Sequence, residues 1–211
     1  MMAPMASGFI LAGGQSSRMG TDKALTLFAG RPLIQVALEA LITAGVSARI
    51  AGSRSSLSAF AEEIPDTFPD QGPLGGVHAA LSDSTMEWNL FLPVDLPLMP
   101  PLLLACLLQR ALLTGAPVTV GRLNGRVQPF PVVLRRTVLP LIVQRLQQGI
   151  SACHAAWQSI PAELGSVLDA VPIEYLQQCG QCPHPRGLPP VLWFVSANTP
   201  ADLARLNRLG A

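Results

Sequence analysis

Charged side chains are scarce in this sequence: Asp, Glu, Lys and Arg make up 13% of its 211 residues, and the formal net charge at pH 7 is +1. A chain so close to neutral has no overall field that would draw it onto nucleic acid. We therefore expect no nucleic-acid partner. Any anion that binds must be held by a local group of side chains.

Cysteine is also rare. Four cysteines in a chain of this length are too few for a disulfide framework, and they fit a reducing compartment. A basic leader followed by an apolar stretch, which would indicate a secretory signal, is missing from residues 1–7. These absences predict a cytoplasmic protein.

No apolar run is long enough to span a membrane, although 49% of the residues are hydrophobic. The longest block, residues 97–108, is interrupted by Pro100 and Pro101 and is followed by Gln109 and Arg110. A spanning helix needs about 18 to 20 apolar residues. The block therefore predicts a buried helix, and we expect no membrane contact.

Strand-like and helix-like segments alternate along most of the chain. Strands are expected at residues 7–12, 48–52, 88–94, 116–121 and 130–134, and helices at 32–44, 57–64, 76–83, 100–115 and 138–149. Residues 191–209 are expected to form a strand, a turn and a helix, with Thr199 as N-cap, Pro200 at the first helical position and Asp202 in the first turn. This alternation predicts one α/β domain over residues 1–211, with a mostly parallel sheet covered by helices on both faces.

Residues 150–190 interrupt that alternation. They contain "CGQCPHPRGLPP", which predicts an irregular surface insertion. Within it, Cys179, Cys182 and His184 have a spacing that could suggest zinc, but a fourth ligand would have to come from Cys153 or His154 elsewhere. We favour a variable loop with reduced thiols.

The stretch "GFILAGGQSSRMGTDKAL", residues 8–25, joins an apolar strand to a loop rich in glycine, hydroxyl groups and positive charge. It lacks the Gly-Lys-Ser/Thr end of a P-loop and the third glycine of the G-x-G-x-x-G dinucleotide motif. Two glycines would still let a ligand approach bare backbone N–H groups, beside Arg18 and Lys23. Both a polyphosphate-binding loop and an ordinary βα turn with solvated charges fit these residues.

Several motifs in order decide between these alternatives. They are Leu11-Ala12-Gly13-Gly14-x-Ser16-x-Arg18-Met19-Gly20-x-Asp22-Lys23, then Gly72-Pro73-Leu74-Gly75-Gly76, then Asp95-Leu96-Pro97, and finally Asn198-Thr199-Pro200. In this respect the chain resembles the molybdenum cofactor guanylyltransferases, within the wider group of nucleotidyltransferases. The similarity runs over nearly the whole chain apart from residues 150–190.

The resemblance implies a Rossmann-like three-layer domain that binds GTP and Mg²⁺. Such an enzyme transfers GMP to the terminal phosphate of molybdopterin and releases pyrophosphate. It also implies transient contact with cofactor-insertion proteins or molybdoenzymes. The roles it implies are catalytic for Arg18, Lys23 and Asp95; nucleotide-binding for Leu11, Ala12, Gly13, Gly14, Lys23, Asp66 and Asp95; substrate-binding for Gly75 and Asn198; and Mg²⁺-binding for Asp95.

Two positions depart from the family pattern. Ala51 stands where a nucleotide-contacting Asn is expected, and Ser196 replaces the first Asn of an Asn-x-Asn-Thr-Pro motif linked to the pterin side. The "LAGG" sequence resembles the guanylyl branch, whereas cytidylyl relatives tend to have Leu-Ala-Ala-Gly. Gly14 would leave room for a purine.

The residues are consistent with the chemistry that the family performs. A phosphate monoester is already anionic at neutral pH, so an attack on the α-phosphate needs charge neutralisation and alignment more than a general base. Without the companion motifs, Asp95 would be a turn or helix cap, and "DQGPLGG" a turn leading into a helix at Pro73. With them, we expect Asp95 to hold the metal at the carboxyl edge of the sheet.

Three other classes of function stay open. A cytidylyl or adenylyl enzyme of the same pathway would differ mainly in the base pocket. A sugar-phosphate nucleotidyltransferase shares the loop motif but usually has a longer chain. A non-catalytic nucleotide-binding module would have no physical reason to keep Arg18, Lys23 and Asp95.

Overall fold

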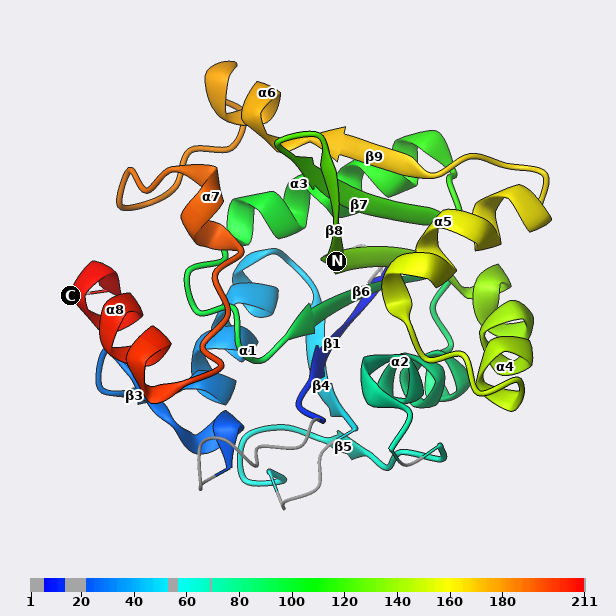
Figure 1. Cartoon of the computed structure of the whole chain (residues 1–211), viewed down its shortest axis with the longest axis horizontal. Helices are drawn as coiled ribbons and strands as arrows, with labels where there is room; N and C mark the ends of the chain where they lie inside the picture. Colours follow the sequence, from blue (N-terminus) through cyan, green and yellow to red (C-terminus); the bar gives the residue numbers. More distant parts are fainter. Residues whose placement is uncertain (1–5, 14–21, 53–56, 69, 211) are drawn as a thin grey trace.

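A seven-stranded sheet with the order β5-β4-β1-β6-β8-β7-β9 forms the centre of the molecule (Figure 1). The computed structural model describes residues 6–13, 22–52, 57–68 and 70–210. The strands are β1 (Ala6–Leu11), β4 (Ser47–Ala51), β5 (Glu63–Ile64), β6 (Trp88–Pro93), β7 (Val118–Leu123), β8 (Arg126–Arg135) and β9 (Asp169–Pro172).

The sheet is mostly parallel. β1 pairs in parallel with β4 and β6, β4 with β5, and β7 with β9, whereas β8 runs antiparallel to both β6 and β7. The predicted α/β class with a mostly parallel sheet is therefore confirmed. Within this sheet, as far as the chain is described, β8 alone runs antiparallel to its neighbours.

The central strand β1 is buried on both faces. Phe9 and Leu11 belong to one hydrophobic core, and Ile10, which points to the opposite side, belongs to the other. Alternate side chains of a strand point to opposite faces, so a strand with helices on both sides must be apolar throughout. This explains the uninterrupted "FIL" of the sequence.

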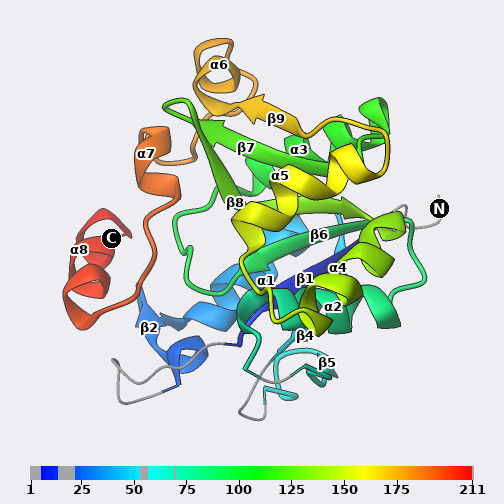
Figure 2. The same cartoon turned by 45° about the vertical axis from the view of Figure 1, so that its right-hand side comes forward.

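Helices cover both faces, which gives three layers (Figure 2). The core on one face includes side chains of α1 and α3, and the core on the other includes side chains of α2, α4 and α5. These helices are α1 (Leu33–Thr43), α2 (Gly72–Asp83), α3 (Pro101–Thr114), α4 (Leu139–Gln147) and α5 (Cys153–Glu163). α3 begins at a proline and ends at Gly115, whose φ of 68° forms a left-handed cap, as its sequence predicts.

Short elements complete the chain, and all but the one just before α4 lie around the α1 and α3 side. They are η1 (Lys23–Leu25), β2 (Leu27–Phe28), β3 (Arg31–Pro32), η2 (Arg136–Val138), α6 (Ile173–Gln178), α7 (Pro190–Trp193) and α8 (Pro200–Gly210). α8 contacts β2, so the end of the described chain lies beside an early hairpin (Figure 1). Thr199 caps α8, because its hydroxyl accepts a hydrogen bond from the Asp202 N–H at 3.1 Å.

The expected helix at residues 57–64 is wrong. Glu63 and Ile64 form β5 instead, opposite Ile50 and Ala51 of β4. The Leu57 N–H donates to the Glu63 carboxylate, which closes a turn in place of a helical bond. Pairing with the sheet outweighs the helical propensity of this segment.

Residues 150–190 are not an irregular insertion as a whole. They form α5, β9 and α6, and β9 extends the central sheet. Trp157 and Ile160 of α5 are fully buried, because this helix covers one face of the sheet.

The prediction of a strand at the start of residues 191–209 is also wrong. Residues 190–193 form the short helix α7, which has Pro190 in its first turn. Trp193 is buried, whereas Val191 is exposed.

Among the residues described, no helix has both the length and the apolar character needed to cross a bilayer.

Candidate active site at the carboxyl ends of β1, β4 and β6

Three neighbouring parallel strands end together at one edge of the sheet. The Ala12 N–H donates to the Ala51 carbonyl at 3.1 Å, and the Val94 N–H donates to the Leu11 carbonyl at 3.1 Å. The chain that follows each strand is therefore placed beside the others. In open α/β sheets this edge is where ligands bind.

Lys23, Asp95 and Asn198 meet at this edge although they lie far apart in the sequence. Lys23 Nζ donates to Asp95 Oδ2 at 2.7 Å and to Asn198 Oδ1 at 2.6 Å. The side chains of Lys23 and Asp95 are 22% and 18% exposed, so the ion pair is only partly open to solvent. The structure thus groups a cation, a carboxylate and an amide that were identified from three separate motifs.

Local backbone geometry holds Lys23 in place. Asp22 caps the short helix η1, because its Oδ1 accepts a hydrogen bond from the Ala24 N–H at 2.9 Å. Ala24 is buried in the core under α1. Lys23, between these two anchored residues, turns toward Asp95.

Glycines let three backbone segments approach one another on the other side of β1. A Cβ on Gly13 would lie 2.4 Å from the Gly52 carbonyl oxygen, and a Cβ on Gly52 would lie 3.4 Å from the Gly76 Cα. The first contact is too short for any side chain, so the backbone after β1 requires glycine here. The role of Gly52 was missed from sequence, although its place after a strand is the available signal.

Asp66 lies against the first turns of α2, beside Gly75. A Cβ on Gly75 would lie 3.1 Å from each Asp66 carboxylate oxygen and 2.7 Å from the Phe68 carbonyl oxygen. Asp66 Oδ1 also accepts a hydrogen bond from the Phe68 N–H at 2.9 Å. The absence of a side chain at Gly75 therefore allows this loop to approach the helix.

His78 supports the same loop from α2. Its Nδ1 lies 3.0 Å from Thr67 Oγ1, and the Phe68 ring packs edge-on at a centroid distance of 4.8 Å. Burial lowers the pKa of His78, and the nearby Asp66 carboxylate acts in the opposite direction. The link between His78 and Asp66 could not be predicted from the sequence.

Of the other residues singled out from the sequence, some are buried in the structure and some lie outside the described residues. Arg18 and Gly14 lie outside the described residues. Leu11 is buried, and its side chain packs beneath Gly76. Ala51 is fully buried and contributes its carbonyl to the bond with Ala12.

The thiols of Cys179 and Cys182 do not belong to any group of potential metal ligands among the described residues. Within the described ranges, no group of three or more His, Cys, Asp or Glu side chains could hold a metal ion. Cys179 is exposed, whereas Cys182 is buried next to Cys106, and burial raises the pKa of Cys182 to about 12.

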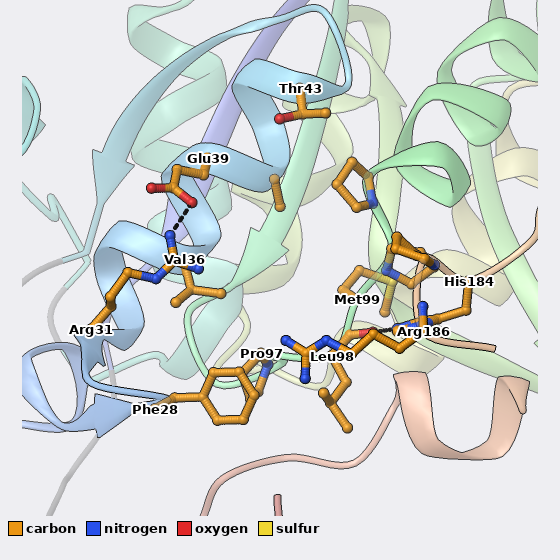
Figure 3. A pocket seen from close by; sticks show the side chains of 14 residues that line it. Phe28, Arg31, Val36, Glu39, Thr43, Pro97, Leu98, Met99, His184 and Arg186 are labelled. Carbon is orange, nitrogen blue, oxygen red and sulfur yellow. Dashed lines mark hydrogen bonds and ion pairs between the residues drawn. The ribbon is translucent and has the colours of Figure 1, made fainter. Parts of the chain in front are cut away.

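A separate pocket of about 200 Å³ lies beside the loop that follows Asp95 (Figure 3). Pro97, Leu98 and Met99 form part of its wall, and Arg31 on its rim is paired with Glu39. Of the described residues expected at the site, none lines this pocket. We therefore place the candidate site at the strand ends and not in this pocket.

A three-layer α/β fold with a lysine and a carboxylate at the strand ends is typical of nucleotide-binding enzymes. Residues 8–160 match the family described as the MobA-like NTP transferase domain, and the chain belongs to this family.

Full-length relatives support the assignment. The chain is 36% identical over 213 residues to a molybdenum cofactor guanylyltransferase of Vibrio atlanticus, covering 99% of each chain. It is 34% identical to one of Acidovorax sp., covering 97% of this chain and 96% of the relative.

Solved structures share the fold. Molybdopterin-guanine dinucleotide biosynthesis protein A of Archaeoglobus fulgidus superposes with a TM-score of 0.75 at 21% identity, covering 96% of this chain and 97% of the other. A nucleotidyl transferase of Methanothermobacter gives a TM-score of 0.73 at 19% identity, with 98% of each chain covered. At these identities the similarity shows the fold alone.

Proposed function

We infer that this chain transfers the GMP group of GTP to the terminal phosphate of molybdopterin and releases pyrophosphate. A terminal phosphate oxygen of molybdopterin forms a new bond to the α-phosphorus of GTP. The bond from that phosphorus to the bridging oxygen of the β-phosphate breaks, and pyrophosphate leaves with the electron pair. The full-length similarity to named guanylyltransferases supports this reaction.

The observation that carries the proposal is the 2.7 Å contact between Lys23 and Asp95 at the ends of β1 and β6. Lys23 would neutralise phosphate charge as the α-phosphate is attacked. A cation fixed in place before the reaction costs no reorganisation during it. Asn198 accepts a hydrogen bond from the same Nζ and so helps to fix its direction.

Nucleotidyltransferases of this family generally use a divalent metal, and we propose that Mg²⁺ binds at Asp95. The chemistry of Asp95 fits such a site: its largely shielded carboxylate stands at the strand edge and already attracts a cation, the Lys23 ammonium at 2.7 Å. For Mg²⁺ to bind there, Lys23 Nζ would move from Asp95 toward the phosphates. Mg²⁺ commonly takes one or two protein carboxylates and completes its coordination with phosphates and water. When bound, it would neutralise the triphosphate and align it for displacement.

Asp66, Gly75 and the backbone at Gly13 are assigned to the nucleotide itself. They lie on the side of β1 opposite Lys23 and Asp95, where helix α2 begins. Backbone N–H groups at a helix start favour an anion or a polar base edge. The roles of Gly14, Arg18 and the pterin-side role of Asn198 stay predictions, as do protein partners and a cytoplasmic location.

Calorimetry with GTP and then CTP, each with Mg²⁺, tests the nucleotide. A marked preference for GTP supports the proposal, and molybdopterin is then added to measure pyrophosphate release. A preference for CTP would move the chain to the cytidylyl branch of the same pathway. Binding of neither nucleotide would contradict catalysis with GTP or CTP and would reopen the alternative of a non-catalytic module.

A further inference from the structure

His184 belongs to the "CGQCPHPRG" stretch, to which the proposed reaction gives no role. Its ring lies in the wall of the pocket beside the Asp95 loop (Figure 3). Nε2 lies 3.2 Å from the Leu98 carbonyl oxygen, and Nδ1 lies 3.0 Å from the Arg186 backbone nitrogen. Because Nδ1 must accept from that N–H, the neutral ring carries its proton on Nε2 and donates it to Leu98.

Leu98 lies in the turn that follows Asp95 directly. The Met99 N–H donates to the Leu96 carbonyl at 3.2 Å and closes this turn. The chain after His184 returns to the same loop, where the Ala197 N–H donates to the Asp95 carbonyl at 2.9 Å. The loop is therefore held at Asp95 and again three residues later, both times by the segment 184–197.

His184 is itself fixed by its surroundings. Its ring stacks on Trp193 with a centroid distance of 5.9 Å and an interplanar angle of 29°. Trp193 is fully buried, and its indole N–H donates to the Leu188 carbonyl at 2.8 Å. Cys182, two residues before His184, is also fully buried. A donor on such a platform can hold a loop without first losing much conformational freedom.

We propose that His184 is a positioning residue for Asp95. Through the Leu98 carbonyl it holds the loop in the geometry in which the Asp95 carboxylate receives the metal of a bound nucleotide. The inference rests on the proposed function, because it requires Asp95 to be the metal ligand. It goes beyond the matched family region, which ends at residue 160.

Two amide substitutions separate this role from simple packing. His184→Gln places an amide N–H near the position of Nε2, where it can still donate to Leu98. His184→Asn places its amide group near the position of Nδ1. Its amide oxygen can still accept from the Arg186 N–H, but its amide N–H cannot reach the Leu98 carbonyl. The probe is Mn²⁺ bound in the presence of saturating GTP, measured by electron paramagnetic resonance, alongside GTP affinity measured without divalent metal.

His184→Asn should weaken Mn²⁺ binding about 3- to 10-fold, the range expected for one hydrogen bond. Its metal-free GTP affinity should stay within about twofold of the wild type. His184→Gln should restore Mn²⁺ affinity to within about twofold. If His184→Asn does not fold, His184→Phe replaces it, since Phe keeps the stack on Trp193 and lacks the donor.

Equal Mn²⁺ affinity in the wild type and the donor-less variant overturns the positioning role. An equal loss in both amide variants does so too, because it would reflect packing alone. A wild type that binds neither GTP nor Mn²⁺ overturns the proposed function and this inference with it. The wild-type titration therefore tells the two failures apart.

Discussion

Residues 6–149 contain the charged side chains of the site, which lie beside the ends of the strands. Residues 150–210 contact those side chains through a loop that is not part of the sheet. Asp95 lies two residues after the end of β6, and Gly13 lies two residues after the end of β1. By contrast, Asn198 and Ala197 approach through a loop between two helices and touch Lys23 and Asp95. The first region creates the site, and the second restrains the groups within it.

The two regions also differ in how they are stabilised. β1 and β6 pair over six residues in the middle of the sheet. The later region adds one strand, β9, at the edge of the sheet, and buries large side chains such as Trp157 and Trp193. Loss of a large buried side chain in the later region should therefore lower stability, whereas loss of a charged group at the strand ends in the earlier region should lower activity.

The largest expected effect is on stability, from Trp157→Ala. The Trp157 side chain is fully buried against the sheet, and its indole N–H donates to the Pro129 carbonyl at 2.9 Å. Removing it should lower the free energy of unfolding by about 3–5 kcal/mol, measured by urea denaturation. Trp157→Phe, which keeps most of the apolar volume, should lose much less. A loss below about 1 kcal/mol would mean that α5 is not part of the core.

The next effect is on catalysis, from Asp95→Ala and Lys23→Ala. Each substitution removes one member of the 2.7 Å ion pair at the strand ends. The value of kcat/KM for pyrophosphate release should fall on the order of 10²-fold or more, as expected when a preorganised charge is lost.

Arg110→Ala is the matched control for that experiment. It breaks a 3.0 Å ion pair with Asp169 that lies between α3 and β9. Exposed pairs contribute little, so kcat/KM should stay within about twofold of the wild type. Near wild-type turnover in both Asp95→Ala and Lys23→Ala would rule out the proposed mechanism.

The same contrast explains which parts could be predicted from sequence. Strand β1 and helix α3 carry local signals, namely an unbroken apolar run before glycines and a proline start with a glycine stop. Asp95 could be placed at the carboxyl edge because parallel strands end there, but its direct contact with Lys23 was not predicted. Asn198, which also binds Lys23, was identified only by the family motif. Its hydrogen bond to Lys23 joins residues 175 positions apart, which no local pattern predicts.

The errors have distinct physical reasons. The segment 57–64 has helical composition, but the edge of β4 offers a pairing partner that local sequence does not show. In α5 the buried residues Cys153, Ala156, Trp157 and Ile160 have helical spacing, which is a signal for a helix. The glycines and prolines of residues 179–190 led to the whole of residues 150–190 being predicted as irregular. The contacts of His184 could not be predicted, because they join segments 86 residues apart.

A smaller effect is expected from Asn198→Ala, which tests the later region at the point where it touches the earlier one. The variant removes one of the two acceptors that hold Lys23 Nζ. Because the residue is exposed and Asp95 remains, kcat/KM should fall by about tenfold, near the lower end for a hydrogen bond to a charged group. Asn198→Gln keeps an uncharged amide acceptor and should retain more activity. Unchanged kcat/KM in Asn198→Ala would mean that the second region does not restrain Lys23.

The smallest expected effect comes from Thr199→Ala at the start of α8. Thr199 and Asp202 satisfy each other: the Thr199 hydroxyl accepts from the Asp202 N–H at 3.1 Å, and the Thr199 N–H donates to Asp202 Oδ2 at 2.9 Å. Loss of such a cap should cost about 1 kcal/mol of unfolding free energy, measured by urea denaturation. Thr199→Ser keeps the hydroxyl and should remain close to the wild type. If Ser and Ala variants lose equally, the Thr199 methyl group and not the cap would anchor α8, and Asn198, one residue earlier, would owe its position to packing.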